Sequence, residues 1–375
     1  MMIGGVLQPG VAEGGEGGGS ATPQDPSVAG SGGAAGAAGS DGVAGAADDG
    51  SGGAINEAPD EVLGPGLSGL PVPNAGGIPE PSGAPGNLRV LPWAGFRAAI
   101  SYTFDDSNQS QIANYDALNG LGVPMTFYLQ TNKPESQNAV WVRALADGHE
   151  LGNHSQSHLG SGNTAQLGAD IDAATRFIEG RFEIEVYTMA APNGFGGYAD
   201  VARTRFMINR GVADQQIQPN ATGGEFNLPC FIPATNAPAS AFNAKVDAIR
   251  QNGTWQTVLV HGFNGFNDFA FQPVSLQAFL DAVNYAKSFR DVWIDTVLEV
   301  GAYWLGQRAF NAAAPTSSDG RTTWTWTLPA NFPPGKFLRV VVDGGTLTQD
   351  GARLAWDDHG YYEVSLDRGS LTLSP

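Results

Sequence analysis

Short apolar runs alternate with helical periodicity through the middle of the chain, between residues 98 and 307. The runs are continuous rather than alternating, which is typical of strands covered on both faces of a parallel sheet. They lie at residues 98–104, 124–129, 186–189, 257–260 and 292–294, with a short strand at 148–153. Helical periodicity covers residues 111–119, 139–147, 164–179, 200–209, 241–251 and 275–289, and a last helix runs to Gln307. This succession of units predicts an α/β fold with a parallel barrel.

Two segments within this region predict loops. Residues 215–239 contain several prolines and glycines, and they predict a long loop that walls the binding groove or covers the barrel end. Residues 263–269 are polar and aromatic with a glycine hinge. This second loop suits stacking on the rings of a ligand and is equally compatible with phenylalanines that pack inward.

The pattern changes after Pro315 to short strands separated by Gly, Asp and Pro. They are expected at residues 322–328, 337–342, 361–366 and 371–373. We therefore predict a small antiparallel β-sandwich over residues 316–375, packed on the barrel because so short a segment has a marginal core. Four aromatic residues in it are expected in the core or the interface rather than in a sugar-stacking platform: Trp324, Trp326, Trp356 and Tyr361.

The first 88 residues are rich in Gly, Ala, Pro and Ser, and no Lys or Arg precedes Arg89. Such a segment cannot bury enough apolar surface to offset its ordering entropy, so we predict a disordered linker over residues 1–88. The catalytic barrel is then expected over residues 89–312, followed by the sandwich. The single cysteine, Cys230, excludes an intrachain disulfide.

The chain carries a formal net charge of -18, and ten of its 37 acidic residues lie before Arg89. An acidic protein repels phosphates at long range, so we expect no nucleic-acid partner and no anionic membrane surface. No stretch is long enough to span a membrane, so no direct membrane insertion is expected either. A neutral or cationic glycan is the better-suited partner.

Two polar clusters carry the candidate chemistry. Asp105 and Asp106 follow the run at 98–104, and His154 and His158 follow the short strand at 148–153. Each cluster alone is common in solvated turns. In parallel α/β folds, however, ligands gather at the carboxyl ends of strands, where both clusters fall. Two imidazoles four positions apart on a helical turn, with Asp106 as an oxygen ligand, predict a divalent-metal site that leaves Asp105 free to act as a base.

These residues resemble the NodB-type polysaccharide deacetylases, the family 4 carbohydrate esterases, over about residues 95 to 308. The resemblance implies a distorted (β/α)7 barrel. It also implies Asp105 as general base, with Asp106, His154 and His158 as ligands of a divalent metal, Zn²⁺ before Co²⁺, Ni²⁺ or Mn²⁺. His261, which ends the run at 257–260, is implied as the general acid that protonates the leaving group.

Two departures from the family pattern concern the groups around the base and the acid. The segment 189–194 resembles the third family motif, but its usual arginine is Ala190, as in some branches of the family. Without that positive partner we expect a higher pKa for Asp105 than in arginine-bearing relatives. The Asp-Trp motif that usually orients the acid histidine is not recognisable, and Asp214 and Asp295 are candidates for that role. Residues 357–359, Asp-Asp-His, are expected to form a solvated turn.

The sequence thus predicts a metal-dependent hydrolase that removes N-acetyl or O-acetyl groups from a polysaccharide. The alternatives are an acetylxylan esterase with the same residues, and a non-catalytic glycan-binding protein on the same fold. The first residues have neither a basic nor an adequate apolar segment for secretion. A long Gly/Ala/Pro/Ser tether suits a secreted or cell-envelope protein, so we expect a signal segment upstream of this sequence.

Overall fold

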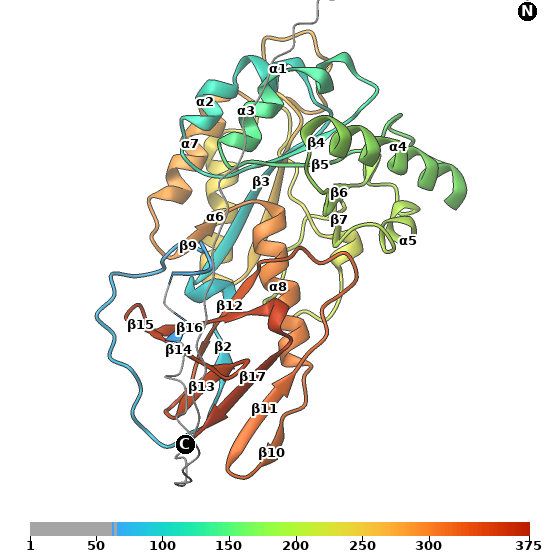
Figure 1. The fold of residues 1–375 in the computed structure, drawn as a ribbon. Helices are drawn as coiled ribbons and strands as arrows, with labels where there is room; N and C mark the ends of the chain where they lie inside the picture. The colour runs from blue at the N-terminus through green and yellow to red at the C-terminus, as the bar shows by residue number, and fades with distance from the viewer. Residues whose placement is uncertain (1–61, 64–65) are drawn as a thin grey trace, which may run out of the picture. The chain divides into compact units, whose positions relative to one another are not determined.

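Seven parallel strands form one curled sheet in the computed structural model, which describes residues 62–63 and 66–375 (Figure 1). Six of them follow the order β7-β6-β5-β4-β3-β8, and β9 pairs with β3. Their bounds are β3 (Ala98–Phe104), β4 (Thr126–Leu129), β5 (Glu150–Asn153), β6 (Thr188–Ala190), β7 (Ile208–Arg210), β8 (Trp255–Val260) and β9 (Val292–Ile294). All seven residues of β3 are buried, as expected for a central strand covered on both faces.

The segment predicted as a long loop completes the sheet between its two end strands. Leu228 donates its backbone N–H to Asn209 of β7 at 2.9 Å, and Phe231 donates to Thr257 of β8 at 2.9 Å. Residues 228 and 231 also form parallel bridges to β7 and β8. The segment therefore bridges the open side of the sheet, and the predicted distorted barrel is confirmed.

Helices connect the parallel strands and cover the outside of the sheet (Figure 1). Their bounds are α1 (Gln109–Ala113), α2 (Tyr115–Asn119), α3 (Val140–Ala146), α4 (Thr164–Phe182), α5 (Tyr198–Ala202), α6 (Ala239–Asn252), α7 (Leu276–Lys287) and α8 (Val297–Asn311). Amphipathic spacing explains why they pack. In α6, Phe242, Val246 and Ile249 are buried at positions i, i+4 and i+7. The helix ends at Gly253, whose left-handed conformation lets its N–H bond to Ile249.

The helix predicted over residues 200–209 is wrong in its second half. The observed helix α5 ends at Ala202, and Ile208–Arg210 forms β7. The physical reason is pairing with a neighbour far away in sequence, since Thr188, Met189 and Ala190 of β6 face Ile208, Asn209 and Arg210 in parallel register. Two of the three residues of β7, Asn209 and Arg210, are polar, so no apolar run marks this strand in the sequence.

The C-terminal part is a sandwich of two sheets, as predicted. One has the order β1-β14-β13-β17-β11-β10 and the other β15-β16-β12-β2. Their bounds are β1 (Val62–Leu63), β2 (Arg89–Val90), β10 (Thr316–Ser318), β11 (Arg321–Thr325), β12 (Phe337–Val341), β13 (Thr346–Gln349), β14 (Ala352–Leu354), β15 (Trp356–Asp357), β16 (Tyr361–Ser365) and β17 (Ser370–Ser374). Two of these strands, β1 and β2, precede the barrel in sequence. The sandwich therefore takes strands from both sides of the barrel domain.

Helix α8 lies between the parallel sheet and the C-terminal strands (Figure 1). Most of its residues are buried, which is typical of a helix covered on all sides. One hydrophobic cluster joins α8 residues such as Trp304 to Trp255 of the barrel and to Leu338 and Leu366 of the sandwich. Trp326 and Tyr361 are buried, and Trp324 and Trp356 are partly buried against this cluster, so the expected core or interface position is confirmed.

Most of the predicted linker, residues 1–61 and 64–65, lies outside the described residues. Residues 66–88 lie against the sandwich. Ser68 donates its backbone N–H to Glu363, and Arg339 donates to the backbone carbonyls of Leu70, Pro71 and Ala94 at 2.7–3.0 Å. The boundaries proposed at residues 88, 312 and 316 stay predictions. Within the described residues, no helix combines the length and the apolar character needed to cross a membrane.

Candidate active site

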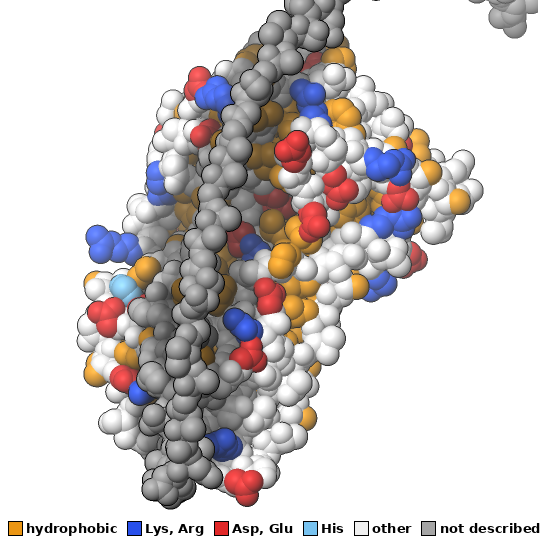
Figure 2. All heavy atoms as spheres, viewed as in Figure 1, with side chains coloured by type: hydrophobic (Ala, Val, Ile, Leu, Met, Phe, Trp, Pro, Cys, Tyr) orange, Lys and Arg blue, Asp and Glu red, His pale blue; other side chains and the backbone are white. Residues whose placement is uncertain are grey.

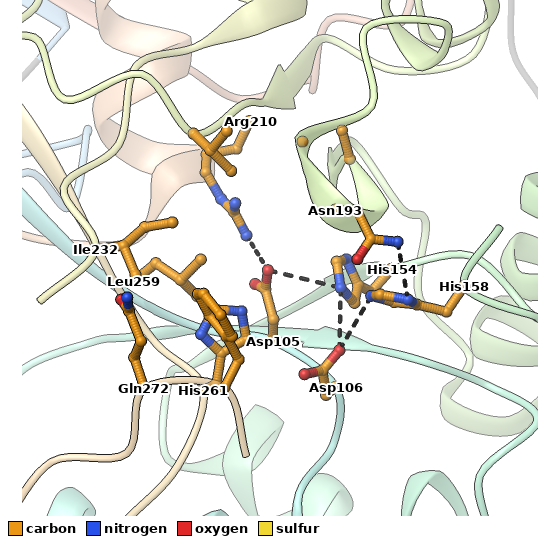
Figure 3. Close-up of a pocket in the computed structure, with 14 residues that line it drawn as sticks. Asp105, Asp106, His154, His158, Asn193, Arg210, Ile232, Leu259, His261 and Gln272 are labelled. Atoms are coloured by element: carbon orange, nitrogen blue, oxygen red, sulfur yellow. Dashed lines mark hydrogen bonds and ion pairs between the residues drawn. The ribbon is translucent and has the colours of Figure 1, made fainter. Parts of the chain in front are cut away.

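Five residues predicted from the sequence meet at the carboxyl ends of the parallel strands (Figure 3). Asp105 and Asp106 follow β3, His154 follows β5, and His261 follows β8, while His158 lies four residues after His154. All five line one cavity of about 530 Å³. The strand order explains the meeting, because β3 is paired with β8 and is separated from β5 by β4 alone.

Asp106, His154 and His158 point toward one another in the geometry of a metal site (Figure 3). Oδ1 of Asp106 lies 3.2 Å from Nε2 of His154 and 3.4 Å from Nε2 of His158. Three ligands of a tetrahedral ion with bonds of about 2.1 Å are separated by about 3.4 Å, so one divalent cation fits between these atoms. Burial tends to raise the pKa of Asp106, yet the imidazoles hold that pKa well below its ordinary value.

The ring of His154 is oriented by a backbone group. Its Nδ1 lies 2.9 Å from the carbonyl oxygen of Ala190 at the end of β6. A carbonyl can only accept, so Nδ1 carries a proton, and Nε2, on the side of Asp106, is the nitrogen that can bind a metal. This is the tautomer that a metal ligand needs.

The two histidines are brought together by strained loops and not by the predicted helical turn. Residues 154–158 form a bend, with Ser155 at φ +61° and His158 at φ +54°. Asp106 also lies in the left-handed region, at φ +74°. Such conformations cost of order 1 kcal/mol each and persist where the surroundings hold them. Here Asn153 accepts a bond from Ser155 N–H at 2.6 Å, and the carboxylate of Asp170 on α4 accepts one from Ser157 N–H at 3.0 Å.

Asp105 is buried beside these three residues and is paired with an arginine. Arg210 Nη2 donates to its Oδ2, and the guanidinium is fully buried (Figure 3). Burial alone would raise the pKa of Asp105, but Arg210 and His154 hold it below its ordinary value. The premise that Asp105 lacks a positive partner is therefore wrong, while the expected difference from arginine-bearing relatives stays a prediction. Arg210 comes from β7 and supplies the positive partner that Ala190 lacks.

His261 lies on the other side of Asp105 from His154 and His158 (Figure 3). The pKa of His261 lies below its ordinary value, because burial outweighs the opposing effect of the carboxylates of Asp105 and Asp106. Its Nδ1 is buried and has no hydrogen-bond partner among the described residues. Neither candidate for an orienting carboxylate pairs with it. Asp214 pairs with Lys245, and Asp295 accepts from Trp293 Nε1 at 3.0 Å and from Thr296 N–H at 2.8 Å.

Sequence reasoning missed three residues that shape this site. Besides Arg210, Gln111 donates from Nε2 to the carbonyl of Asp105 at 2.5 Å and to the carbonyl of His261 at 2.7 Å. Asn108 donates to the same His261 carbonyl at 2.8 Å. These amides tie the end of β3 to the end of β8. Their only signal in sequence is polar character in the segment after Asp106, which any turn shares.

A second group with metal-ligand atoms is Asp357, Asp358 and His359 in the sandwich. His359 Nδ1 lies 2.6 Å from Oδ1 of Asp357, and the backbone around them bonds to Asn74 and Ile78. This turn is thus partly covered by the preceding chain, and its histidine and aspartate are already paired with each other.

Comparison with known proteins supports the assignment made from the motifs. Residues 97–206 match the family model described as polysaccharide deacetylase. This range contains Asp105, Asp106, His154 and His158, and it ends before Arg210 and His261. The resemblance inferred from the motifs is therefore confirmed over these residues, whose matching family is one of hydrolases.

More distant likenesses were also found. A gellan lyase from Bacillus sp is 24% identical over 247 residues, 59% of this chain, and the chain spans only 10% of that protein's length. The structure is similar to a family 4 acetyl xylan esterase from Clostridium thermocellum in complex with a cobalt ion, with 19% identity, coverage of 54% and 89% of the two chains and a TM-score of 0.36. It is also similar to peptidoglycan deacetylase PdaC from Bacillus subtilis (18%, 54% and 89%, 0.33) and to Puue allantoinase (13%, 56% and 92%, 0.45).

Proposed function

We propose that this domain is a metal-dependent deacetylase that hydrolyses N-acetyl or O-acetyl groups on a polysaccharide. The observation that carries the proposal is one carboxylate and two imidazoles whose ligand atoms meet at 3.2 and 3.4 Å, next to a second buried carboxylate. Asp105 Oδ1 is buried and has no hydrogen-bond partner among the described residues. A free carboxylate oxygen beside a cation site is what the activation of a water molecule requires.

The roles of the residues follow from their positions. Asp106, His154 and His158 would hold the cation, Zn²⁺ before Co²⁺, Ni²⁺ or Mn²⁺. When bound, the cation supplies a Lewis acid that polarises the acetyl carbonyl and lowers the pKa of water. Asp105 takes the proton of the attacking water through its free Oδ1. Arg210 keeps Asp105 ionised and fixes its orientation, since the guanidinium bonds to the other oxygen.

His261 gives a proton to the departing nitrogen or oxygen of the sugar, because an unprotonated amine is a very poor leaving group. Apolar side chains of Ile232 and Leu259 line the cavity near His261 (Figure 3). They offer an apolar surface to the acetyl methyl group. In this arrangement the water attacks from the Asp105 side of the acyl carbon, and the sugar departs on the His261 side.

The charge distribution supports a glycan rather than a polyanion. Acidic and basic side chains are interspersed on the face seen in Figure 2, where the described residues show no continuous basic patch. A neutral acetylated sugar meets no long-range repulsion from such a surface. We further propose that the protein acts outside the cell or at the cell envelope, where such polymers occur.

Acetate release tests the proposal directly. The Zn²⁺-loaded protein is offered chitooligosaccharides, peptidoglycan fragments, poly-N-acetylglucosamine and acetylxylan. We expect release from at least one of them, a loss of about a hundredfold or more in kcat for Asp105→Asn, and little change for Asp116→Asn, a surface carboxylate on α2. Release from acetylxylan alone would identify an esterase. Binding of a glycan without any release would identify a non-catalytic protein and refute the proposal.

A further inference from the structure

The loop that follows β8 presents two phenylalanines to solvent beside the cavity. The side chain of Phe269 is 96% exposed, and that of Phe271 is 57% exposed. Phe271 and its neighbour Gln272 line the cavity together with Asp105 and His261. Exposing a whole phenylalanine ring forfeits about 2 kcal/mol of burial, which is a disfavoured arrangement unless a ligand covers the ring.

The backbone of this loop holds the rings outward. Phe269 has φ +53° and Gln272 has φ +47°, and both are non-glycine residues in the left-handed region. The base of the loop is pinned by a bridge between Phe263 and Val274. Its middle is pinned by Asp268, whose carboxylate accepts from the backbone N–H of Ser110 at 2.8 Å. The exposure of the rings therefore belongs to a held conformation.

The loop also folds back against the end of β8. A side chain on Gly262 would come within 2.6 Å of the Ala270 side chain, so only glycine lets residues 268–271 lie this close to His261. The ring of Phe271 contacts His261 edge to face, with centroids 5.3 Å apart. Phe271 thus lies on the His261 side of the cavity, and Phe269 precedes it by two residues in the same loop.

We infer that Phe269 and Phe271 form a stacking platform for consecutive pyranose rings of a glycan chain. The inference rests on the proposed function and adds to it the two residues that hold the polymer on the leaving-group side of the site. The sugar is the leaving group, so it has to lie on the side of His261, which protonates it. Phe271 then meets the ring that loses its acetyl group, and Phe269, two residues further from the cavity lining, meets the next ring. The apolar C–H face of a pyranose suits an aromatic ring held in place.

Chain-length dependence of hydrolysis tests this inference. For the polymer that the acetate panel identifies, kcat/KM is measured on oligomers of one to six units. We expect the parent protein to favour longer oligomers, and Phe269→Ala to lower kcat/KM about three- to tenfold for two or more units, with no change for the single unit. Phe269→Tyr should restore the preference, because it keeps the ring. Val142→Ala, another exposed apolar position, on α3, is the matched control.

Each outcome is decisive because Phe269 touches too little of the protein for its loss to unfold the domain. Equal kcat/KM for all lengths, or an undiminished preference in Phe269→Ala, would overturn the platform while leaving the deacetylase intact. A Phe269→Ala protein that changes from dimer to monomer without losing the preference would show that the rings meet a second copy of the chain. If the metal-loaded parent hydrolyses no glycan in the panel, the proposed function is refuted, and the stacking platform that rests on it is refuted as well.

Discussion

Ala190 and Arg210 are register partners across β6 and β7, and each orients one residue of the candidate site. The carbonyl of Ala190 orients His154, and the guanidinium of Arg210 bonds to Asp105. The arginine that the family motif would place at residue 190 is thus replaced by one from the neighbouring strand. Moving a charge by one strand preserves its partner, because adjacent strands of a parallel sheet end at the same edge.

Replacing Arg210 should move the pH dependence of the reaction. Arg210 lowers the pKa of Asp105, so this carboxylate, the proposed base, stays ionised well into the acidic range. In Arg210→Met the carboxylate keeps its burial and loses this partner, so its pKa rises. We expect the acidic limb of the kcat/KM profile to shift upward by about 1 to 3 pH units, with a lower plateau.

Arg210→Lys separates charge from geometry. It keeps a positive charge but loses the planar fork, so a smaller shift is expected than for Arg210→Met. A profile whose acidic limb stays in place in both variants would show that Arg210 does not set the ionisation of Asp105.

The place of Arg210 in the site could not be predicted from the sequence, whereas several other features could. Long buried runs such as β3 were predictable because their apolar pattern is local. The motifs at Asp105 and His154 were predictable because each directly follows such a strand. Arg210 was not, since β7 exists through its pairing with β6 and carries only three residues.

The same limit explains the closure of the barrel and the make-up of the sandwich. Residues 228–231 complete the sheet through bonds to β7 and β8, although the prolines and glycines of the surrounding segment, residues 215–239, predict an ordinary loop. β2 pairs with β12, about 250 residues away, and the two residues of β2 alone do not indicate this pairing. Contacts of this kind depend on the folded arrangement and leave no periodic signal.

The buried carboxyl group of Asp295 should make stability fall as pH rises. Burial raises its pKa to about 6, from an ordinary value of 3.8. The protonated form is therefore favoured in the folded state, and its contribution is complete below pH 3.8 and lost as the pH rises through about 6. The free energy of unfolding of Asp295→Asn, relative to the parent, should increase by on the order of 2 kcal/mol between pH 4 and pH 7.

Urea denaturation at several pH values measures this difference. Asp116→Asn serves as the surface control for the general pH response of the protein. A relative stability of Asp295→Asn that is flat with pH, or that decreases, would be incompatible with a raised pKa of Asp295.

Arg339 should be essential to the attachment of residues 66–94 to the sandwich. It is buried, pairs with Glu363, and donates to three backbone carbonyls of that segment. Arg339→Met leaves Glu363 uncompensated and those carbonyls without their donor, so we expect a loss of about 3 to 5 kcal/mol in the free energy of unfolding. Limited proteolysis should also cut residues 66–88 faster.

The exposed pair of Arg353 and Glu80 offers a matched control in the same region. Arg353→Met should cost no more than about 1 kcal/mol, because solvent screens the pair. Equal losses in the two variants would mean that Arg339 acts as an ordinary surface charge.

The cation site itself is tested most directly by counting bound ions. The purified protein is stripped with a chelator, reloaded with Zn²⁺, dialysed and analysed for metal, with folding checked by circular dichroism. We predict one tightly bound ion per chain in the parent and in His359→Ala, and none in His154→Ala/His158→Ala. An unchanged metal content in the double variant, or a loss in His359→Ala alone, would contradict the account.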